Sequence, residues 1–366
     1  MTTIIASEKA VSATMLNDTT DHVILVSYRR RVLWKTVVLA VLAVLCLLAF
    51  VLDLVTGPSG LTPWQVLQGL LSSGGLSLPQ QTIIWQVRLP YALMAMLVGA
   101  SLSLAGVEMQ TILNNPLASP FTLGISSAAS FGAALAIVMG VTLPFVPAAW
   151  MIPFNAFLCA LASVLMLQTM ARLRGAGVES VVLLGIALVF VFNALVAFVQ
   201  FVSSEAALQQ LVFWSMGSLS RANWTSVSVL AVVLACVVPF SFHASARLTA
   251  LRLGEDRARS FGINVTRLRF MALLRVSLLA ATSVAFVGTI GFIGLVGPHI
   301  ARLLLGEDHR FLLPASLLSG ALIMSLASAA SKVLVPGVLL PVGIVTAMVG
   351  VPVFLCLIFL RPRRSS

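Results

Sequence analysis

Apolar residues fill most of this chain in unbroken runs of about 20 residues, separated by shorter polar stretches. The runs do not alternate between apolar and polar positions, as the strands of a membrane barrel do. Each run is long enough to cross the hydrocarbon core of a bilayer as an α-helix. We therefore predict about ten membrane-spanning helices, at residues 33–54, 88–113, 122–140, 148–170, 180–202, 224–243, 270–288, 289–305, 312–331 and 340–360.

The composition agrees with this pattern. The chain is 60% hydrophobic and 9% charged, whereas about a quarter of the residues of a soluble domain are charged. No linker or low-complexity tract divides it, and the first apolar run is long enough to remain as a span rather than act as a cleavable signal. We predict an all-α integral membrane protein with a cytoplasmic tail (1–32), one transmembrane domain (33–360) and a second cytoplasmic tail (361–366).

The basic residues predict the orientation. An even number of spans places both termini on one side of the membrane. That side would hold all of the 22 lysines and arginines except Arg88, Arg221 and Lys332. The positive-inside rule therefore predicts cytoplasmic termini for this multi-pass protein. The net charge of +11 reflects this topology, and no basic cluster on a soluble domain indicates a nucleic-acid partner.

Cysteine and histidine spacing indicates no metal site. The four cysteines occur singly within predicted spans, with no CxxC pair. The four histidines lack a ligand spacing such as HExxH. We expect no cofactor or metal bound by this chain, with Cys46, Cys159, Cys236 and Cys356 as packing residues.

A glycine-rich block follows the seventh predicted span. Glycine occupies every third position, and a proline follows the last glycine. Glycine costs a helix roughly 1 kcal/mol at each interior position. In a membrane protein it also allows close approach of two backbones, or a chain reversal that neighbouring protein surrounds. We predict such a structural role for Gly288, Gly291, Gly294, Gly297 and Pro298.

The longest polar interruption on the inner side spans residues 244–269. Glu255 and Asp256 suit a helix N-terminus, and Gly262 suits a helix end. Asn264 or Thr266 could cap a second short helix. The segment is either a firm projection of two short helices or a solvated basic loop that follows the positive-inside rule.

Glu108 is an acidic residue well inside a predicted span. An acid within the membrane is a candidate functional group, for example in a proton relay. However, Glu108 lies about 30 Å along the helix from Arg88, close to the inner headgroups. We expect a solvated acid near the cytoplasmic mouth.

Several separated motifs occur in a fixed order from residue 85 to 360. They are RLP (88–90), LVGA (97–100), NPLA (115–118), LGISS (123–127), FWSMGSL (213–219), LGE (253–255), GTIGFIGLVGPHIAR (288–302), DHR (308–310) and LPVGIVT (340–346). In these motifs the chain resembles the permease subunits of the iron–siderophore and cobalamin ABC importers, the FecCD-type or type II importers. The glycine-rich block followed by LPVGIVT is the most specific part of this resemblance.

The resemblance implies a protein of a bacterial inner membrane with a fold like that of the cobalamin-importer permease. It also implies a subunit that pairs with a second permease, identical or paralogous. It also implies two cytoplasmic ATPase subunits and a periplasmic or lipid-anchored binding protein. The chain has no GxxxxGK[ST] phosphate loop. We therefore expect ATP and Mg²⁺ on the partner ATPase, and a transport subunit rather than an enzyme.

The resemblance also assigns residues. It implies that the 244–269 segment forms coupling helices that dock on the ATPase, through Leu253, Gly254, Glu255, Asp256, Arg257, Arg259 and Gly262. Arg88 and Lys332 match positions that pair with acids on the binding protein, although a second basic residue common in the family is replaced here by Tyr91. Candidates for the translocation path are Met109, Gln110, Asn114, Ser126 and Ser127. The cytoplasmic gate would lie near Val178 and Glu179, where the small hydroxyl residues of the family are not evident.

The expected substrate is an iron(III)–siderophore complex, with cobalamin and haem as close alternatives. Two other classes remain open from the sequence. An ion-coupled secondary transporter would need midplane sites, commonly with buried carboxylates. An intramembrane serine protease would need a serine paired with a histidine, for which Ser126 and His299 are conceivable.

Overall fold

The computed structural model describes the backbone of residues 2–71, 76–144, 146–173 and 178–359, and the side chains of residues 26–71, 76–144, 146–170, 179–353 and 355. The described part is mainly helical and contains no β-strand. Seven of its helices are long and apolar enough to cross a membrane, and three shorter apolar helices accompany them. These helices coincide with the ten predicted spans, which confirms the predicted fold class.

The elements are, in chain order, α1 (Thr2–Val55), α2 (Pro63–Leu71), α3 (Leu78–Thr82), the π-helix η1 (Ile83–Arg88), α4 (Leu89–Ile112), α5 (Ile125–Ile137), the 3₁₀ turn η2 (Ala148–Trp150), α6 (Met151–Leu173), α7 (Val178–Phe201), α8 (Glu205–Ser215), the 3₁₀ turn η3 (Leu219–Arg221), α9 (Trp224–His243), α10 (Ser245–Leu251), α11 (Glu255–Ser260), α12 (Val265–Val287), α13 (Ile293–Leu305), α14 (His309–Val333) and α15 (Val342–Phe359).

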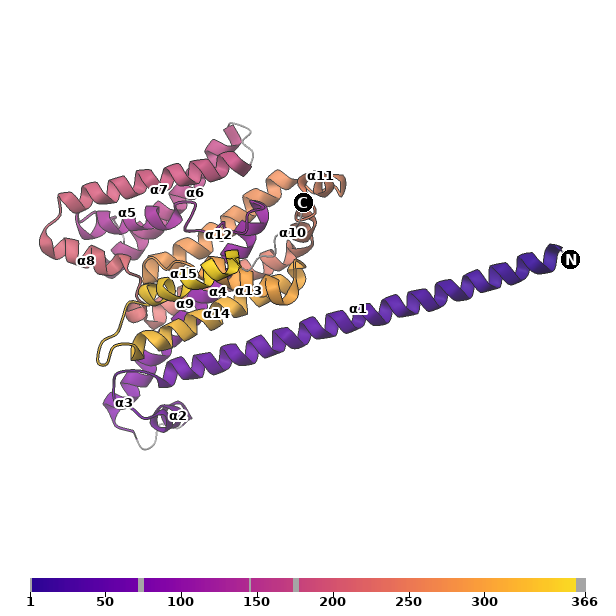
Figure 1. Cartoon of the computed structure of the whole chain (residues 1–366). Helices are drawn as coiled ribbons and strands as arrows, with labels where there is room; N and C mark the ends of the chain where they lie inside the picture. The colour runs from indigo at the N-terminus through magenta and orange to yellow at the C-terminus, as the bar shows by residue number, and fades with distance from the viewer. Residues whose placement is uncertain (1, 72–75, 145, 174–177, 360–366) are drawn as a thin grey trace.

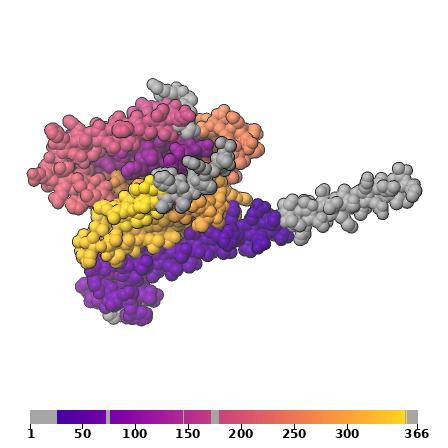
Figure 2. Space-filling view, in the orientation of Figure 1, coloured from indigo at the N-terminus to yellow at the C-terminus, as the bar shows by residue number. Residues whose placement is uncertain are grey.

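Helix α4 is the centre of the fold and is buried along most of its length. It packs against α14, α12, α13 and α9, while α1 runs along α14. Helices α5, α6 and α7 pack on one another, and α6 joins them to α12. In Figure 1, α10 and α11 lie at the opposite end of the molecule from α2, α3 and α8. Figure 2 shows α1 covering one side and the α6–α8 region the other.

A widened helical turn precedes α4. Pro90 is the second residue of α4 and has no N–H to donate to the carbonyl of the residue four positions earlier. The helix changes here to the wider π pattern, in which Leu89 N donates to Ile84 O. Arg88 is the last residue of this turn, and its side chain points into the protein.

Candidate functional site

The glycine block forms the turn between α12 and α13. Gly288 ends α12 with a positive φ of 81°, which glycine adopts without a steric cost. A Cβ atom at Gly288 would collide with Trp214 O. This turn is also tied to neighbouring segments, because Ser218 N donates to Val287 O at 2.7 Å. Gly288 therefore lies where the chain reverses, which is one of the two roles expected of these glycines.

Two later glycines allow α13 to approach other helices closely. A Cβ atom at Gly297 would collide with Ser103, and one at Gly294 would lie 3.0 Å from Leu102 O. The closest approach is at Gly106 of α4, where an added Cβ would collide with Gly294 O. Gly291 is different, since an added Cβ would meet nothing within 4 Å. Gly294 and Gly297 therefore lie at close approaches between helices, whereas Gly291 lies in the turn between α12 and α13.

The 244–269 segment folds into two short helices, α10 and α11, followed by the start of α12. Gly254 precedes α11 with φ +112°, and Gly262 follows it with φ +76°. Glu255 and Asp256 lie in the first turn of α11, as predicted. The predicted second short helix was misplaced, because Asn264 caps the long helix α12 by accepting a hydrogen bond from Arg267 N at 2.9 Å. The other short helix, α10, precedes Gly254 instead.

The surface of this segment combines charged and apolar groups. Glu255 contacts Arg259 and Arg269, each at 2.7 Å. Partial burial opposes ionisation of Glu255, but hydrogen bonds from Arg269 and Arg259 hold its pKa below the ordinary value. Leu253 and Phe261 are 54% and 64% exposed. The segment is therefore a structured projection with apolar side chains at its surface, rather than an irregular basic loop.

The other predicted coupling residues lie on the same projection. Asp256, Arg257 and Arg259 are exposed. Added Cβ atoms at Gly254 and Gly262 would meet nothing within 4 Å. Each of these positions is therefore accessible to a partner from the cytoplasmic side.

The side chains of Arg88 and Lys332 are buried, whereas direct docking would require them at the outer surface. Arg88 is 5% exposed and donates to the last carbonyls of α1, at 2.8 Å to Val55 O and 3.2 Å to Leu54 O. It thereby caps the C-terminal end of α1, where cations are favoured. Lys332 is 8% exposed and its Nζ lies 2.8 Å from Asp53 Oδ1.

Asp53, the partner of Lys332, has a role that the sequence did not reveal. Asp53 also accepts a hydrogen bond from Ser328 Oγ at 2.7 Å. Tyr91 presents its ring to Lys332 Nζ, 4.5 Å from the ring centroid. Arg88 and Lys332 are therefore both paired inside the chain, and their docking role stays a prediction. Asp53 could have been found as an acid at the same membrane depth as Lys332.

Glu108 is also paired within the chain. It is 1% exposed and accepts hydrogen bonds from Arg275 of α12, at 3.0 Å from Nε and 2.7 Å from NH2. The expectation of a solvated acid is therefore wrong. Arg275, which the orientation argument assigned to the inner side, lies near the middle of α12 and is 8% exposed.

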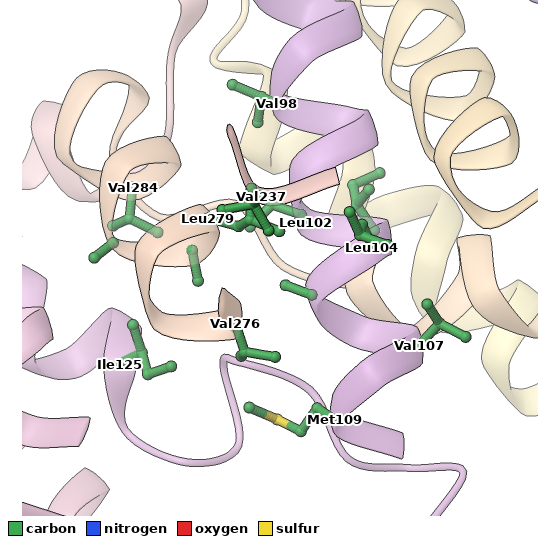
Figure 3. Packing of buried hydrophobic residues seen from close by; sticks show 14 of the residues in the cluster. Val98, Leu102, Leu104, Val107, Met109, Ile125, Val237, Val276, Leu279 and Val284 are labelled. Carbon is green, nitrogen blue, oxygen red and sulfur yellow. The ribbon is translucent and has the colours of Figure 1, made fainter. Parts of the chain in front are cut away.

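The predicted path residues separate into two groups. Met109, Gln110 and Ser126 are buried within this single chain, and Figure 3 shows Met109 among apolar side chains of the core. They face helices of their own chain in this structure, and their place on the translocation path stays a prediction. Asn114 is exposed and Ser127 partly exposed. Glu179 is exposed in the first turn of α7, whereas the side chain of Val178 lies outside the described residues.

The described residues contain no group of three or more His, Cys, Asp or Glu side chains able to hold a metal ion. Within the same part of the chain, Cys46, Cys159 and Cys236 are free. Cys356 lies outside the described side chains.

Comparison with known proteins identifies the family. Residues 45–360 match the model of the FecCD transport family. The chain is 37% identical to the Fe(3+)-citrate import system permease protein YfmE of Bacillus subtilis, over 89% of this chain and 95% of that protein. It is 36% identical to the hemin transport system permease protein HmuU of Yersinia pestis, over 81% and 93% of the two chains.

Two further similarities extend this result. The chain is 36% identical to the vitamin B12 import system permease protein BtuC of Citrobacter koseri, over 92% of this chain and 96% of that protein. A solved inward-facing structure of a metal-chelate type ABC transporter superposes with a TM-score of 0.78 at 32% identity, over 88% of this chain and 98% of that one. The chain therefore belongs to the FecCD transport family, the multi-pass inner-membrane permease subunits of type II ABC importers for metal chelates.

Proposed function

We propose that this permease carries an iron(III)–siderophore complex from the periplasm to the cytoplasm, driven by a separate ATPase. The α10–α11 projection is the observation that supports ATP-driven transport. It presents Leu253 and Phe261 at the cytoplasmic face of a chain that has no phosphate loop of its own. The import of iron(III) citrate and of haem by relatives supports an iron chelate as the substrate. Cobalamin and haem are the alternatives.

The proposed assembly contains two permease subunits, two ATPases that bind α10 and α11, and a binding protein at the outer face. Helix α7 exposes large apolar side chains, including Phe190 at 70% and Phe201 at 87%. Lipid and a second permease subunit are the apolar partners that such a face requires. We expect ATP and Mg²⁺ to bind the ATPase rather than this chain. Arg88 and Lys332 would contribute to docking by fixing the outer ends of α1, α4 and α14 rather than by pairing directly with the binding protein.

Uptake in sealed proteoliposomes tests this proposal. We expect the permease with its ATPase and binding protein to accumulate iron-loaded siderophores only when ATP is enclosed with the ATPase. An ATPase variant that lacks the phosphate-loop lysine should abolish uptake and serves as the control. Uptake by the permease alone would overturn the ATP-driven mechanism. Transport of cobalamin or haem without iron–siderophore transport would replace the proposed substrate.

A substitution at Gly262 tests the role of the projection. Gly262→Leu places a side chain at φ +76° with nothing within 4 Å of its Cβ. The backbone strain is about 1–2 kcal/mol and stays local, so we expect normal membrane insertion but reduced uptake. Gly140→Leu is the matched control, since Gly140 has φ +60°, the same open surroundings and a position outside α10 and α11. Normal uptake by Gly262→Leu, or equal losses in both variants, would contradict a role in coupling.

A further inference from the structure

Arg252 joins the α10–α11 projection to the inner end of α4. It lies between the two short helices, and its guanidinium donates in two directions. NH1 donates to Asn114 Oδ1 at 2.8 Å, and NH2 donates to Glu307 Oε1 at 2.8 Å. Asn114 follows the last turn of α4 with φ +43°, and Glu307 lies in the turn between α13 and α14. The Arg252 side chain therefore connects the projection to two other parts of the inner face.

The contacts continue from Glu307 into the membrane domain. Arg302 of α13 lies 3.1 Å from Glu307 through Nε, and its NH1 donates to Gln110 Oε1 at 3.0 Å. Gln110, which is buried on α4, donates to Gly294 O at 3.4 Å. An unbroken series of polar contacts thus leads from Arg252 to the glycine-rich start of α13.

Two further contacts bind the last turn of α4, which lies next to Asn114. Arg269 Nε donates to Ile112 O at 3.2 Å while the same guanidinium binds Glu255 of α11. His309 bridges Thr111 of α4 and Thr249 of α10, at 2.8 and 3.2 Å. The last turn of α4 is therefore bonded, directly or through one side chain, to both short helices. A displacement of the projection cannot leave the end of α4 in place without breaking these bonds.

Charge strengthens the link at Arg252. Half-burial of Glu307 opposes its ionisation, but Arg302 and Arg252 hold its pKa below the ordinary value. It is therefore a carboxylate at cytoplasmic pH, and hydrogen bonds to it are charge-assisted. Only a planar guanidinium presents fixed donors to two acceptors in this way, since a lysine ammonium is a point charge on a flexible stem.

The link borders a cavity of about 570 Å³ at the cytoplasmic face. Its lining includes Thr249, Arg252, Leu253, Glu307, Asp308 and Arg310. A side chain of the ATPase that enters this cavity would touch the Arg252–Glu307 pair directly.

We infer that Arg252 is a positioning residue for ATP-driven transport, which transmits movement of the α10–α11 projection to α4 and, through Glu307 and Arg302, to α13. The inference rests on the proposed function, because it requires an ATPase bound to the projection. It assigns the transmission to the geometry of one guanidinium between Asn114 and Glu307 rather than to positive charge alone.

The test measures transport and ATP hydrolysis together in the reconstituted complete importer. For Arg252→Gln we expect ATP hydrolysis to continue while substrate moved per ATP falls about fivefold or more, the lower end for coupling between distant protein sites. Arg252→Lys retains the charge and should restore at most part of the ratio. Arg30→Gln is the control, because Arg30 is an exposed residue of α1 outside this series and should keep the wild-type ratio.

Two outcomes would overturn the inference while leaving the proposed function intact. One is a wild-type transport-to-ATP ratio in Arg252→Gln. The other is full recovery in Arg252→Lys, which would reduce the role to charge. If the Arg252→Gln importer fails to assemble, the transport-to-ATP ratio is measured for Glu307→Gln instead. An unchanged ratio in Glu307→Gln would also overturn the inference. Absence of ATP-driven uptake in the wild-type importer would instead refute the proposed function.

Discussion

Glu108→Leu is expected to destabilise the folded permease by about 3–5 kcal/mol, the usual cost of removing one partner of a buried ion pair. Glu108 and Arg275 join α4 to α12 in the interior of the protein, through hydrogen bonds of 2.7–3.0 Å. Without Glu108, the Arg275 guanidinium stays charged in surroundings that contain little water. Arginine is not deprotonated in proteins, so this variant has no simple way to relieve the unpaired charge.

Two further variants distinguish the effect of the buried charges from the effect of side-chain packing. Arg275→Met should cost less than Glu108→Leu, because a lone carboxyl group can take up a proton and become neutral. The double variant Glu108→Leu/Arg275→Met should recover much of the lost stability, since apolar side chains often replace a buried ion pair at little cost. This order of stabilities is expected if an unpaired buried charge, rather than the loss of one particular contact, causes the destabilisation.

Thermal unfolding of the purified protein in detergent measures these differences. Arg310→Gln is the control, because it removes an ion pair with Asp308 in which the Arg310 side chain is 58% exposed. Such a pair contributes up to about 1 kcal/mol. If Glu108→Leu unfolds within the range of Arg310→Gln, or if the double variant is the least stable of the set, the pair does not hold α4 against α12.

The length of the apolar runs was sufficient to predict the ten helices. Span length depends on local composition, and the bilayer thickness fixes the scale. The boundaries of α11 were also predictable, since the acids in its first turn and the glycine that follows its last turn act within a few residues. These features need no knowledge of which helices touch.

The ion pairs could not be predicted in the same way. Glu108 was placed near the inner headgroups by counting from Arg88, and nothing in the sequence shows that Arg275, which is 167 positions away, faces it. The pairing of Lys332 could not be predicted either, because its partner Asp53 lies on α1, far away in the sequence. Where a charge within a span finds an opposite charge depends on helix packing, which the pattern of apolar residues leaves undetermined.

Gly106→Ala is expected to destabilise the protein even though alanine is the better helix former. In an exposed helix this change would gain roughly 1 kcal/mol. Here the new methyl group would collide with Gly294 O, a backbone atom that cannot rotate away as a side chain does. Overpacking of this kind costs about 1–3 kcal/mol, so steric repulsion between α4 and α13 should exceed the gain in helix propensity.

Gly291→Ala is the matched control from the glycine block. An alanine there has open space within 4 Å and no positive φ, so its stability and uptake should remain close to wild type. Thermal unfolding should place Gly106→Ala well below Gly291→Ala, and Gly106→Leu should fail to accumulate in the membrane because the larger side chain forces the helices apart. A Gly106→Ala protein as stable as wild type would mean that α4 and α13 separate at little cost. The glycines would then serve the turn at Gly288 rather than the contact between these two helices.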